Sequence, residues 1–235
     1  MKTKYIISLT CLFLLLSCKT SYIVKSTNNH VLRINSLADT SILNIIHPYK
    51  NKIEKEMNKI LCYTETDLKK KKPQSRLGNF VVDLCLDYAN VDFCIMNNGG
   101  LRTEIDKGPI TVGKIYELMP FENELVVIEV DKEIFTKIIQ YIISRNGEPF
   151  FGAEIILDKY GKLIDYKTNF DLNKKTKIKI LTTDYLANGG DDMFFFKNIK
   201  QKKIGTKLRD AILDYCSRKD TLKIELDNRI IVNEN

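Results

Sequence analysis

Apolar residues along this 235-residue chain recur at the spacings of amphipathic helices and of buried strands. The first helical run extends from Ile42 to Ile60, with Pro48 as an expected kink or restart. A second follows Ser75, a good N-terminal cap, and keeps one apolar face from Leu77 to Tyr88. Further helices are expected near residues 114–119 after the cap Thr111, from the cap Asp131 to Asn146-Gly147, and at residues 208–215.

Continuous apolar and β-branched runs predict strands between these helices. The clearest is ELVVIEV at residues 124–130, which we expect in the interior of a sheet, and residues 153–168 predict a hairpin turning at Tyr160-Gly161. Further strands are expected to begin at residues 31–34 and to occupy residues 92–96, 177–183 and 222–232. Helices and strands mix without strict alternation, so we predict an α+β fold, a single domain of mixed sheets and helices at residues 31–235.

The N-terminal residues have the pattern of an export signal. Lys2 and Lys4 precede an apolar run of about a dozen residues, which is shorter than the roughly 20 that cross a bilayer. Leu-Leu-Ser-Cys at residues 15–18 resembles a bacterial lipobox. We therefore expect a signal peptide at residues 1–17, lipidation at Cys18 and a polar tether at residues 18–30. The alternatives are a plain signal peptide and a single transmembrane helix.

This interpretation implies a cell-envelope protein held by a lipid anchor, in the outer membrane or periplasm of a Gram-negative-type bacterium. Disulfides are permitted there, yet none of the cysteines has CxxC spacing, so neither a redox motif nor a zinc knuckle is predicted. Cys85 and Cys94 fall within apolar patterns and are expected as buried thiols, while a bridge from Cys62 stays open.

The formal net charge is +7, and part of it is the lysine run at residues 69–72. Such a run is usually a solvated loop, although it can also steer anions towards a pocket. No aromatic residue interrupts it, so we predict no nucleic-acid binding.

Two glycine-pair turns carry the candidate chemistry: NNGGLR at residues 97–102 and DYLANGGDD at residues 184–192, with PFEN at residues 120–123 between them. Glycines let a backbone approach a ligand closely with its N–H groups bare. Arg102 offers a planar fork for phosphate, and Phe121 and Tyr185 offer faces for a base. Asp191 offers acceptors for a pair of sugar hydroxyls.

With these turns, the stretch GPITVGKIYELMPFENELV and the upstream PQSRLGNFVVDLCLDY, the chain resembles the C-terminal, substrate-specificity domain of the 5′-nucleotidase family. That resemblance implies a domain that grips a nucleoside while a separate domain holds two metal ions and does the chemistry. It implies these substrate-binding residues: Asn97, Gly99, Gly100, Arg102, Phe121, Asn123, Tyr185, Gly190 and Asp191. It also implies a further phosphate-binding arginine ahead of Gly78-Asn79, where Lys71 and Arg76 are alternatives.

Each feature also has a structural explanation. Glycine pairs are commonly plain turns, Phe121 after a proline is commonly core, and Asp191-Asp192 can cap a loop. The three phenylalanines at residues 194–196 are expected to pack rather than to stack on a ligand.

The catalytic half of a phosphoesterase is not predicted here. A two-metal site needs several His and Asp ligands, whereas the sequence has two histidines, His30 and His47, both expected at the surface, and no DxH or GNH segment. We therefore predict no catalytic residues, no metal ligands and no cofactor in this chain, with divalent metals in a partner.

Three functions fit this pattern. The first is the recognition subunit of a split nucleotidase whose metallophosphatase is a separate chain. The second is a free-standing nucleotide- or nucleoside-binding lipoprotein, and the third is a scaffold with a relict site. The intact set of clamp residues favours the first two.

Overall fold

The computed structural model describes residues 39–233. Contacts divide the chain into two compact units, residues 1–44 and 45–235, and the first contributes only the start of one helix to the described part. The predicted signal peptide, the lipidation site at Cys18, the tether, His30 and the strand expected at residues 31–34 lie outside the described residues. Among residues 39–233, no helix combines the length and apolar character needed to cross a bilayer.

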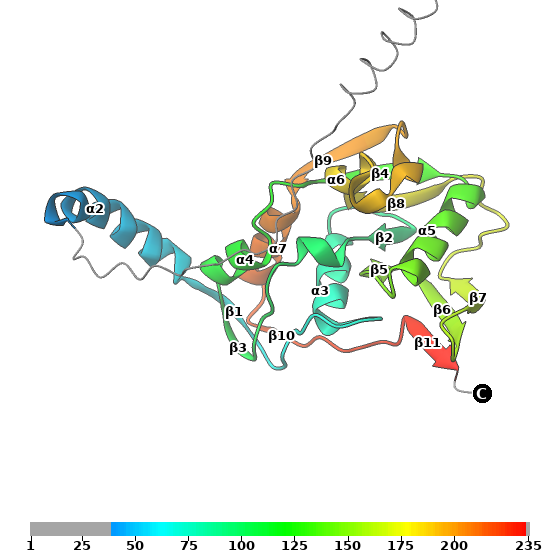
Figure 1. The fold of residues 1–235 in the computed structure, drawn as a ribbon, viewed down its shortest axis with the longest axis horizontal. Coiled ribbons are helices and arrows are strands. Elements are labelled where there is room, and N and C mark those ends of the chain that lie inside the picture. Colours follow the sequence, from blue (N-terminus) through cyan, green and yellow to red (C-terminus); the bar gives the residue numbers. More distant parts are fainter. Residues whose placement is uncertain (1–38, 234–235) are drawn as a thin grey trace, which may run out of the picture. The chain divides into compact units, whose positions relative to one another are not determined.

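The body contains three sheets and several helices (Figure 1). A five-stranded sheet has the order β5-β2-β8-β4-β9, and two three-stranded sheets have the orders β10-β1-β3 and β11-β6-β7. The strands are β1 Ile60–Thr64, β2 Phe93–Ile95, β3 Gly108–Thr111, β4 Glu124–Val130, β5 Phe150–Phe151, β6 Ala153–Asp158, β7 Leu163–Thr168, β8 Ile178–Thr183, β9 Gln201–Lys207, β10 Thr221–Leu222 and β11 Ile230–Asn233.

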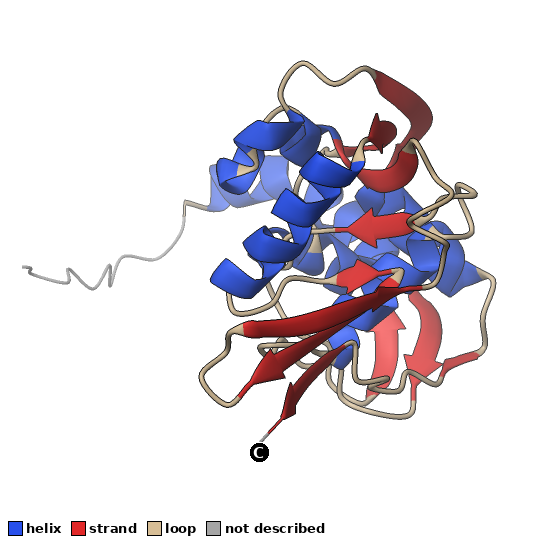
Figure 2. Cartoon of the chain, turned by 90° about the vertical axis from the view of Figure 1, so that its right-hand side faces the viewer, coloured by secondary structure: helices blue, strands red, loops and turns tan. Residues whose placement is uncertain are grey.

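The helices are α2 Thr40–Met57, α3 Arg76–Cys85, α4 Val112–Leu118, α5 Lys132–Ser144, α6 Asp184–Ala187 and α7 Leu208–Ser217. Helices and strands are mixed throughout the body (Figure 2), so the predicted α+β class is confirmed. The caps are confirmed as well: Ser75, Thr111 and Asp131 each accept a hydrogen bond from a backbone N–H of the first turn. Gly147 follows α5 with φ +92°, which an L side chain rarely adopts.

Two hydrophobic cores lie on opposite faces of the five-stranded sheet. Alternate residues of β4, such as Val126 and Ile128, join the core under α5, while Leu125 joins the core under α3 and α7. The strand is paired on both sides, by β8 and β9, which confirms its predicted interior position. The hairpin β6–β7 and its turn at Gly161 are also as predicted.

Two expectations from the pattern are wrong. The first helix was expected to reach Ile60 but ends at Met57. Ile60 instead begins β1, which pairs with β3 in a sheet. The single closing strand expected at residues 222–232 is two short strands in different sheets, because Leu222 pairs with β1 and Ile230 pairs with β6. The intervening residues have no strand structure.

The four cysteines of the described part are buried and free. Cys85 and Cys94 are fully buried in the core, as predicted. Cys62 on β1 has the thiol of Cys216 on α7 as its hydrogen-bond partner, which lowers the pKa of Cys62. The bridge left open for Cys62 is absent from the described residues.

Candidate functional site

The three segments singled out in the sequence meet at one edge of the five-stranded sheet. β2 and β8 are parallel, so the turns that follow them lie at the same edge. β4 is antiparallel to β8, with Leu125 opposite Thr183, so the PFEN segment before β4 is brought to that edge too. The Asp184 carboxylate links the start of β4 to the turn that follows β8. It accepts hydrogen bonds from the backbone N–H of Glu124 (3.0 Å) and of Tyr185 (2.8 Å).

A cavity of about 280 Å³ lies between these segments. Eight of the nine predicted site residues line it, and no other residue of the described part does: Asn97, Gly99, Gly100, Arg102, Phe121, Asn123, Tyr185 and Asp191. The structure thus brings the predicted set together in one place. We call this cavity the ligand cavity.

Gly190, the ninth residue, lines an adjoining cavity of about 440 Å³ that it shares with Tyr185 and Asn123. A Cβ at Gly190 would lie 2.5 Å from the Tyr185 ring, so only glycine leaves room for that ring. Gly190 therefore positions an aromatic wall instead of lining the ligand cavity.

The two rings at the ligand cavity are available for contact. Phe121 is 41% exposed and Tyr185 is 44% exposed, although aromatic side chains of this size are usually well buried. The guanidinium of Arg102 lies 5.9 Å from the centre of the Phe121 ring, and its Nη1 donates a hydrogen bond to the carbonyl of Gly99 at 3.3 Å. Arg102 is exposed, and its side chain forms no other hydrogen bond among residues 39–233.

Asp191 connects the two glycine turns. Its Oδ2 accepts from Nδ2 of Asn97 (2.6 Å), and its Oδ1 accepts from the hydroxyl of Tyr185 (2.9 Å). That hydrogen bond to the carboxylate raises the pKa of Tyr185. The backbone of Asp191 is left-handed, with φ 49°, which turns the carboxylate towards the cavity. Each carboxylate oxygen keeps a second lone pair for a ligand hydroxyl.

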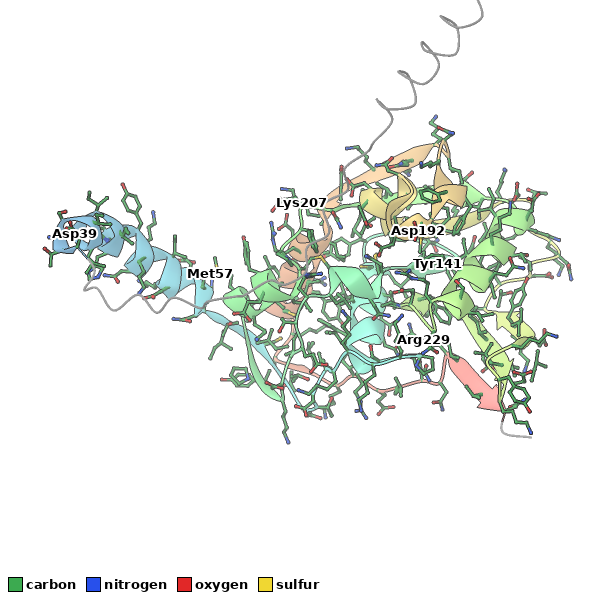
Figure 3. All side chains as sticks on the ribbon, in the orientation of Figure 1. Asp39, Met57, Tyr141, Asp192, Lys207 and Arg229 are labelled. Atoms are coloured by element: carbon green, nitrogen blue, oxygen red, sulfur yellow. The ribbon has the colours of Figure 1, made fainter. Side chains whose placement is uncertain are left out.

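Two residues that sequence reasoning missed support this site. The hydroxyl of Tyr141 on α5 donates to the carbonyl of Asp191 at 2.7 Å, and Figure 3 shows Tyr141 beside the neighbouring Asp192. Glu148, just after α5, accepts from the backbone N–H of Asn98 at 2.5 Å. Tyr141 falls on the buried face of a predicted helix, but no local signal distinguishes Glu148.

The lysine run is largely exposed, as expected for a surface loop, and several of its side chains also contact neighbouring segments. Lys69 forms ion pairs with Glu104 and Asp106, Nζ of Lys70 donates to the carbonyl of Leu101, and Lys72 lies 3.9 Å from Glu148. Neither Lys71 nor Arg76, the alternatives for a second phosphate-binding cation, lines the ligand cavity. Lys70 is the member of the run that reaches the chain next to Arg102.

The three phenylalanines differ from one another. Phe196 is buried, and Phe195 meets the Tyr141 ring edge-on at 6.0 Å, as expected for packing. Phe194 is 58% exposed in the cavity that also contains Tyr185, so it does not pack as predicted.

His47 is exposed on α2, as expected. Within residues 39–233 there is no group of three or more His, Cys, Asp or Glu side chains arranged to hold a metal ion.

Known proteins and solved structures resemble this chain. A family model described as 5′-nucleotidase, C-terminal domain, matches residues 55–198, more than half of the chain. The trifunctional nucleotide phosphoesterase protein YfkN of Bacillus subtilis (strain 168) is 30% identical over 152 residues, covering 61% of this chain and 10% of that protein. Protein UshA of Escherichia coli (strain K12) is 24% identical over 160 residues, 64% of this chain and 29% of its own length.

Among solved structures, the 5′-nucleotidase precursor from Thermus thermophilus superposes with a TM-score of 0.70 at 23% identity. The match covers 83% of this chain and 43% of that one, so the fold is the same while the chain spans less than half of each of these proteins. The resemblance drawn from the sequence motifs is confirmed: this chain belongs to the family of 5′-nucleotidase C-terminal domains.

Proposed function

We propose that this chain is the nucleotide- or nucleoside-recognition subunit of a split 5′-nucleotidase-type hydrolase in nucleotide catabolism. A separate metallophosphatase chain supplies the divalent metals and the hydrolysis of the phosphate ester. The observation that carries the proposal is the ligand cavity. It groups two half-exposed rings, a fixed carboxylate and an arginine that has no carboxylate partner among the described residues.

Each of these groups suits one part of a nucleotide. Phe121 and Tyr185 are flat and half-exposed, and base–aromatic stacking contributes about 1–3 kcal/mol per base. The Asp191 carboxylate is an acceptor for paired ribose hydroxyls, and Arg102 is a donor fork for phosphate oxygens. A cavity of about 280 Å³ open to solvent fits a nucleoside with its phosphate directed outwards.

The division of labour follows from the residues present. Hydrolysis in this proposal is metal-assisted, with the metals clamping the attacking and leaving oxygens of an in-line displacement. Among the described residues, no group of three or more His, Cys, Asp or Glu side chains is placed to hold a metal. In this proposal the chain orients the substrate, and a partner performs the chemistry. Orientation alone is a large part of catalysis, because it replaces a bimolecular encounter with a bound geometry.

A surface suited to such a partner exists on α2. None of the residues of the helix is buried, and its exposed large apolar side chains include Ile45, Ile46, Tyr49 and Ile53. An apolar stripe of this kind is costly to leave in water, although the helix runs through Pro48 without a break. The stripe lies next to the start of the family match at residue 55. We therefore assign it to the metallophosphatase partner.

Calorimetric titration tests the recognition step. The polypeptide from Lys19 onwards is titrated with adenosine and with AMP without metal, beside a Phe121→Ala/Tyr185→Ala double variant. Saturable binding that the double variant loses supports the proposal. If the unsubstituted protein binds neither ligand, a nucleotide-capture lipoprotein without a hydrolase partner is excluded and the recognition role fails for the isolated chain.

Reconstitution tests the partner. AMP hydrolysis by a recombinant metallophosphatase from the same genome is measured alone and with this chain. We expect stimulation that Ile45→Asp/Ile53→Asp abolishes, with Lys50→Asp on the same helix as the control. No stimulation, together with intact nucleotide binding, would favour the free-standing binding lipoprotein. Self-association that the same variant abolishes would instead assign the stripe to a second copy.

The proposed location is the cell envelope, with a lipid anchor at Cys18. Incorporation of labelled palmitate into the full-length protein, and its loss in Cys18→Ala, is the expected result; equal labelling of both proteins would refute the anchor.

A further inference from the structure

A single segment holds both walls of the ligand cavity. It comprises the end of α5 and the residues that follow, 141–149, and we call it the brace. On one side, Tyr141 donates to the carbonyl of Asp191. On the other, the carbonyl of Pro149 accepts from the N–H of Met96 at 2.9 Å, and the carbonyl of Gly147 accepts from Nδ2 of Asn98 at 3.2 Å.

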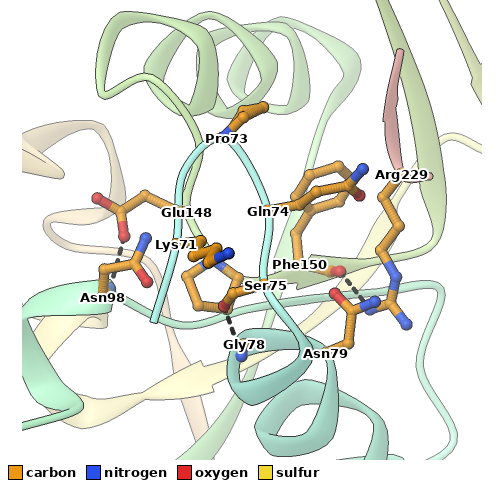
Figure 4. A pocket seen from close by; sticks show the side chains of 11 residues that line it. Lys71, Pro73, Gln74, Ser75, Gly78, Asn79, Asn98, Glu148, Phe150 and Arg229 are labelled. Atoms are coloured by element: carbon orange, nitrogen blue, oxygen red, sulfur yellow. Dashed lines mark hydrogen bonds between the residues drawn. The ribbon is translucent and has the colours of Figure 1, made fainter. Parts of the chain in front are cut away.

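Glu148 is the charged group at the centre of the brace. It is 5% exposed, and its Oε2 accepts from the backbone N–H of Asn98 at 2.5 Å, as the dashed line in Figure 4 shows. Its Oε1 faces two cations, with Nζ of Lys72 at 3.9 Å and Nε of Arg145 at 3.7 Å. Both carboxylate oxygens therefore face donors.

The hydrogen bond from Asn98 fixes the turn that forms the cavity floor. Asn98 begins the short 3-10 turn Asn98–Gly100, and Asn97 immediately before it binds Asp191. The carbonyl of Gly99 within the same turn receives the guanidinium of Arg102. A shift of the Asn98 amide would therefore move the groups that we assign to the sugar and to the phosphate.

We propose that Glu148 is a positioning residue, whose carboxylate holds the Asn98–Gly100 turn in the geometry that accepts a nucleotide. Its effect on affinity rests on the proposed function, whereas its effect on the geometry of the turn does not. Glu148 does not line the ligand cavity, so it acts through Asn98.

Burying a carboxylate costs free energy of folding, and a turn that only had to be stable would not need one. Burial raises the pKa of Glu148, and the negative charge of Asp191 adds to this effect, against the opposing N–H of Asn98, Lys72 and Arg145. A buried carboxyl group kept beside a cavity is the pattern expected where geometry serves binding.

An amide cannot reproduce these contacts. Glutamine at this position has one oxygen and one NH₂ group, and the NH₂ would face either the N–H of Asn98 or the cations Lys72 and Arg145. Glu148→Gln keeps the volume of the side chain, so it tests the charge and the acceptor pattern without opening a cavity.

The experiment compares Glu148→Gln and Glu148→Ala with Glu133→Gln. Glu133 is an exposed glutamate on α5, the helix that precedes Glu148; it is paired with Lys137 at 2.7 Å and is the matched control. Affinity for adenosine and AMP is measured by calorimetry, and the backbone amides of Asn98, Gly99 and Gly100 are followed by NMR. We expect both Glu148 variants to bind both ligands about tenfold more weakly, with shifted amides in the turn and an unchanged control.

Binding by Glu148→Gln equal to that of the unsubstituted protein, with unshifted turn amides, would overturn the proposal. If Glu148→Ala does not fold, Glu148→Gln decides alone. If the unsubstituted protein binds neither ligand, the recognition function fails. The amide shifts of the turn still decide the role of Glu148: shifted amides in Glu148→Gln support that role, and unshifted amides refute it.

Discussion

Arg229 and Arg102 both lie near the brace, but they differ in how many acceptors within the protein surround the guanidinium group. Arg229 is 7% exposed, lines a small void of about 10 Å³, and is surrounded by acceptors. Its guanidinium contacts both oxygens of Asp83 at 2.7–2.8 Å, both oxygens of Asp227 at 2.9–3.0 Å and the carbonyl of Phe150 at 2.6 Å. Arg102 at the ligand cavity is exposed and has one long hydrogen bond.

This difference separates structure from recognition. A guanidinium whose three nitrogens all donate inside the protein joins parts of the fold and has little left for a ligand. A guanidinium beside an exposed ring, with its donors free, is a site for a planar anion. The same residue type in one domain thus serves two roles, and the roles are read from the partners of its N–H groups.

The largest expected effect is on stability at Arg229. Arg229→Ala removes the partner of two carboxylates, and burial already raises the pKa of Asp83 against the opposing charge of Arg229. We expect a loss of about 3 kcal/mol in the free energy of unfolding, measured with urea. Arg102→Ala is the control and should change stability by no more than about 0.5 kcal/mol. Equal losses of unfolding free energy in the two variants would contradict the structural role that we assign to Arg229 and not to Arg102.

The next effect is on nucleoside affinity at the two rings. Phe121→Ala and Tyr185→Ala should each weaken adenosine binding by about 1–3 kcal/mol in calorimetry, because each removes a stacking face. Phe194→Ala is the matched control, since this exposed ring lines only the adjoining cavity. A loss of the same size in Phe194→Ala would show that the ligand lies on the other side of Tyr185.

Arg102 should discriminate between ligands by their phosphate. Arg102→Ala should weaken AMP binding by about 1.5–3 kcal/mol, the range for hydrogen bonds to charged groups, and adenosine binding much less. The AMP affinity of the unsubstituted protein should also fall as salt is added. An equal effect of Arg102→Ala on both ligands would remove the phosphate role.

The smallest effect is a pH dependence that comes from Glu148. Because burial raises its pKa in the folded protein, the unfolded chain loses the proton first, at about 4.5. The stability that Glu148 contributes is therefore complete below that pH and is lost as the pH rises through its folded pKa. Relative to Glu148→Gln, which does not titrate, the melting temperature of the unsubstituted protein should fall as the pH rises above about 4.5 and level off above the folded pKa. A constant difference would mean that the folded pKa is not raised.

Local signals made most elements predictable. The caps Ser75, Thr111 and Asp131 and the apolar face of α3 depend on neighbours a few residues away, and all are confirmed. The strands β1, β3, β5 and β9 were not predicted. Ile60 at the start of β1 also fits the helical spacing before it, β3 and β5 are short, and β9 is mostly lysine and other polar residues. The split of the expected closing strand depends on which distant strands Leu222 and Ile230 meet.

The sequence by itself determined the chemistry available to this protein: glycine turns after strands, an arginine, two aromatic residues and an aspartate, in an order typical of the 5′-nucleotidase family. Only the tertiary structure decided that these groups share one cavity, since that depends on β2 running parallel and β4 antiparallel to β8. The tertiary structure also decided which charged side chains keep hydrogen-bond donors available for a ligand. Arg102 and Arg229 are the same residue type in the sequence. They differ because acceptors from distant parts of the chain surround Arg229 and not Arg102.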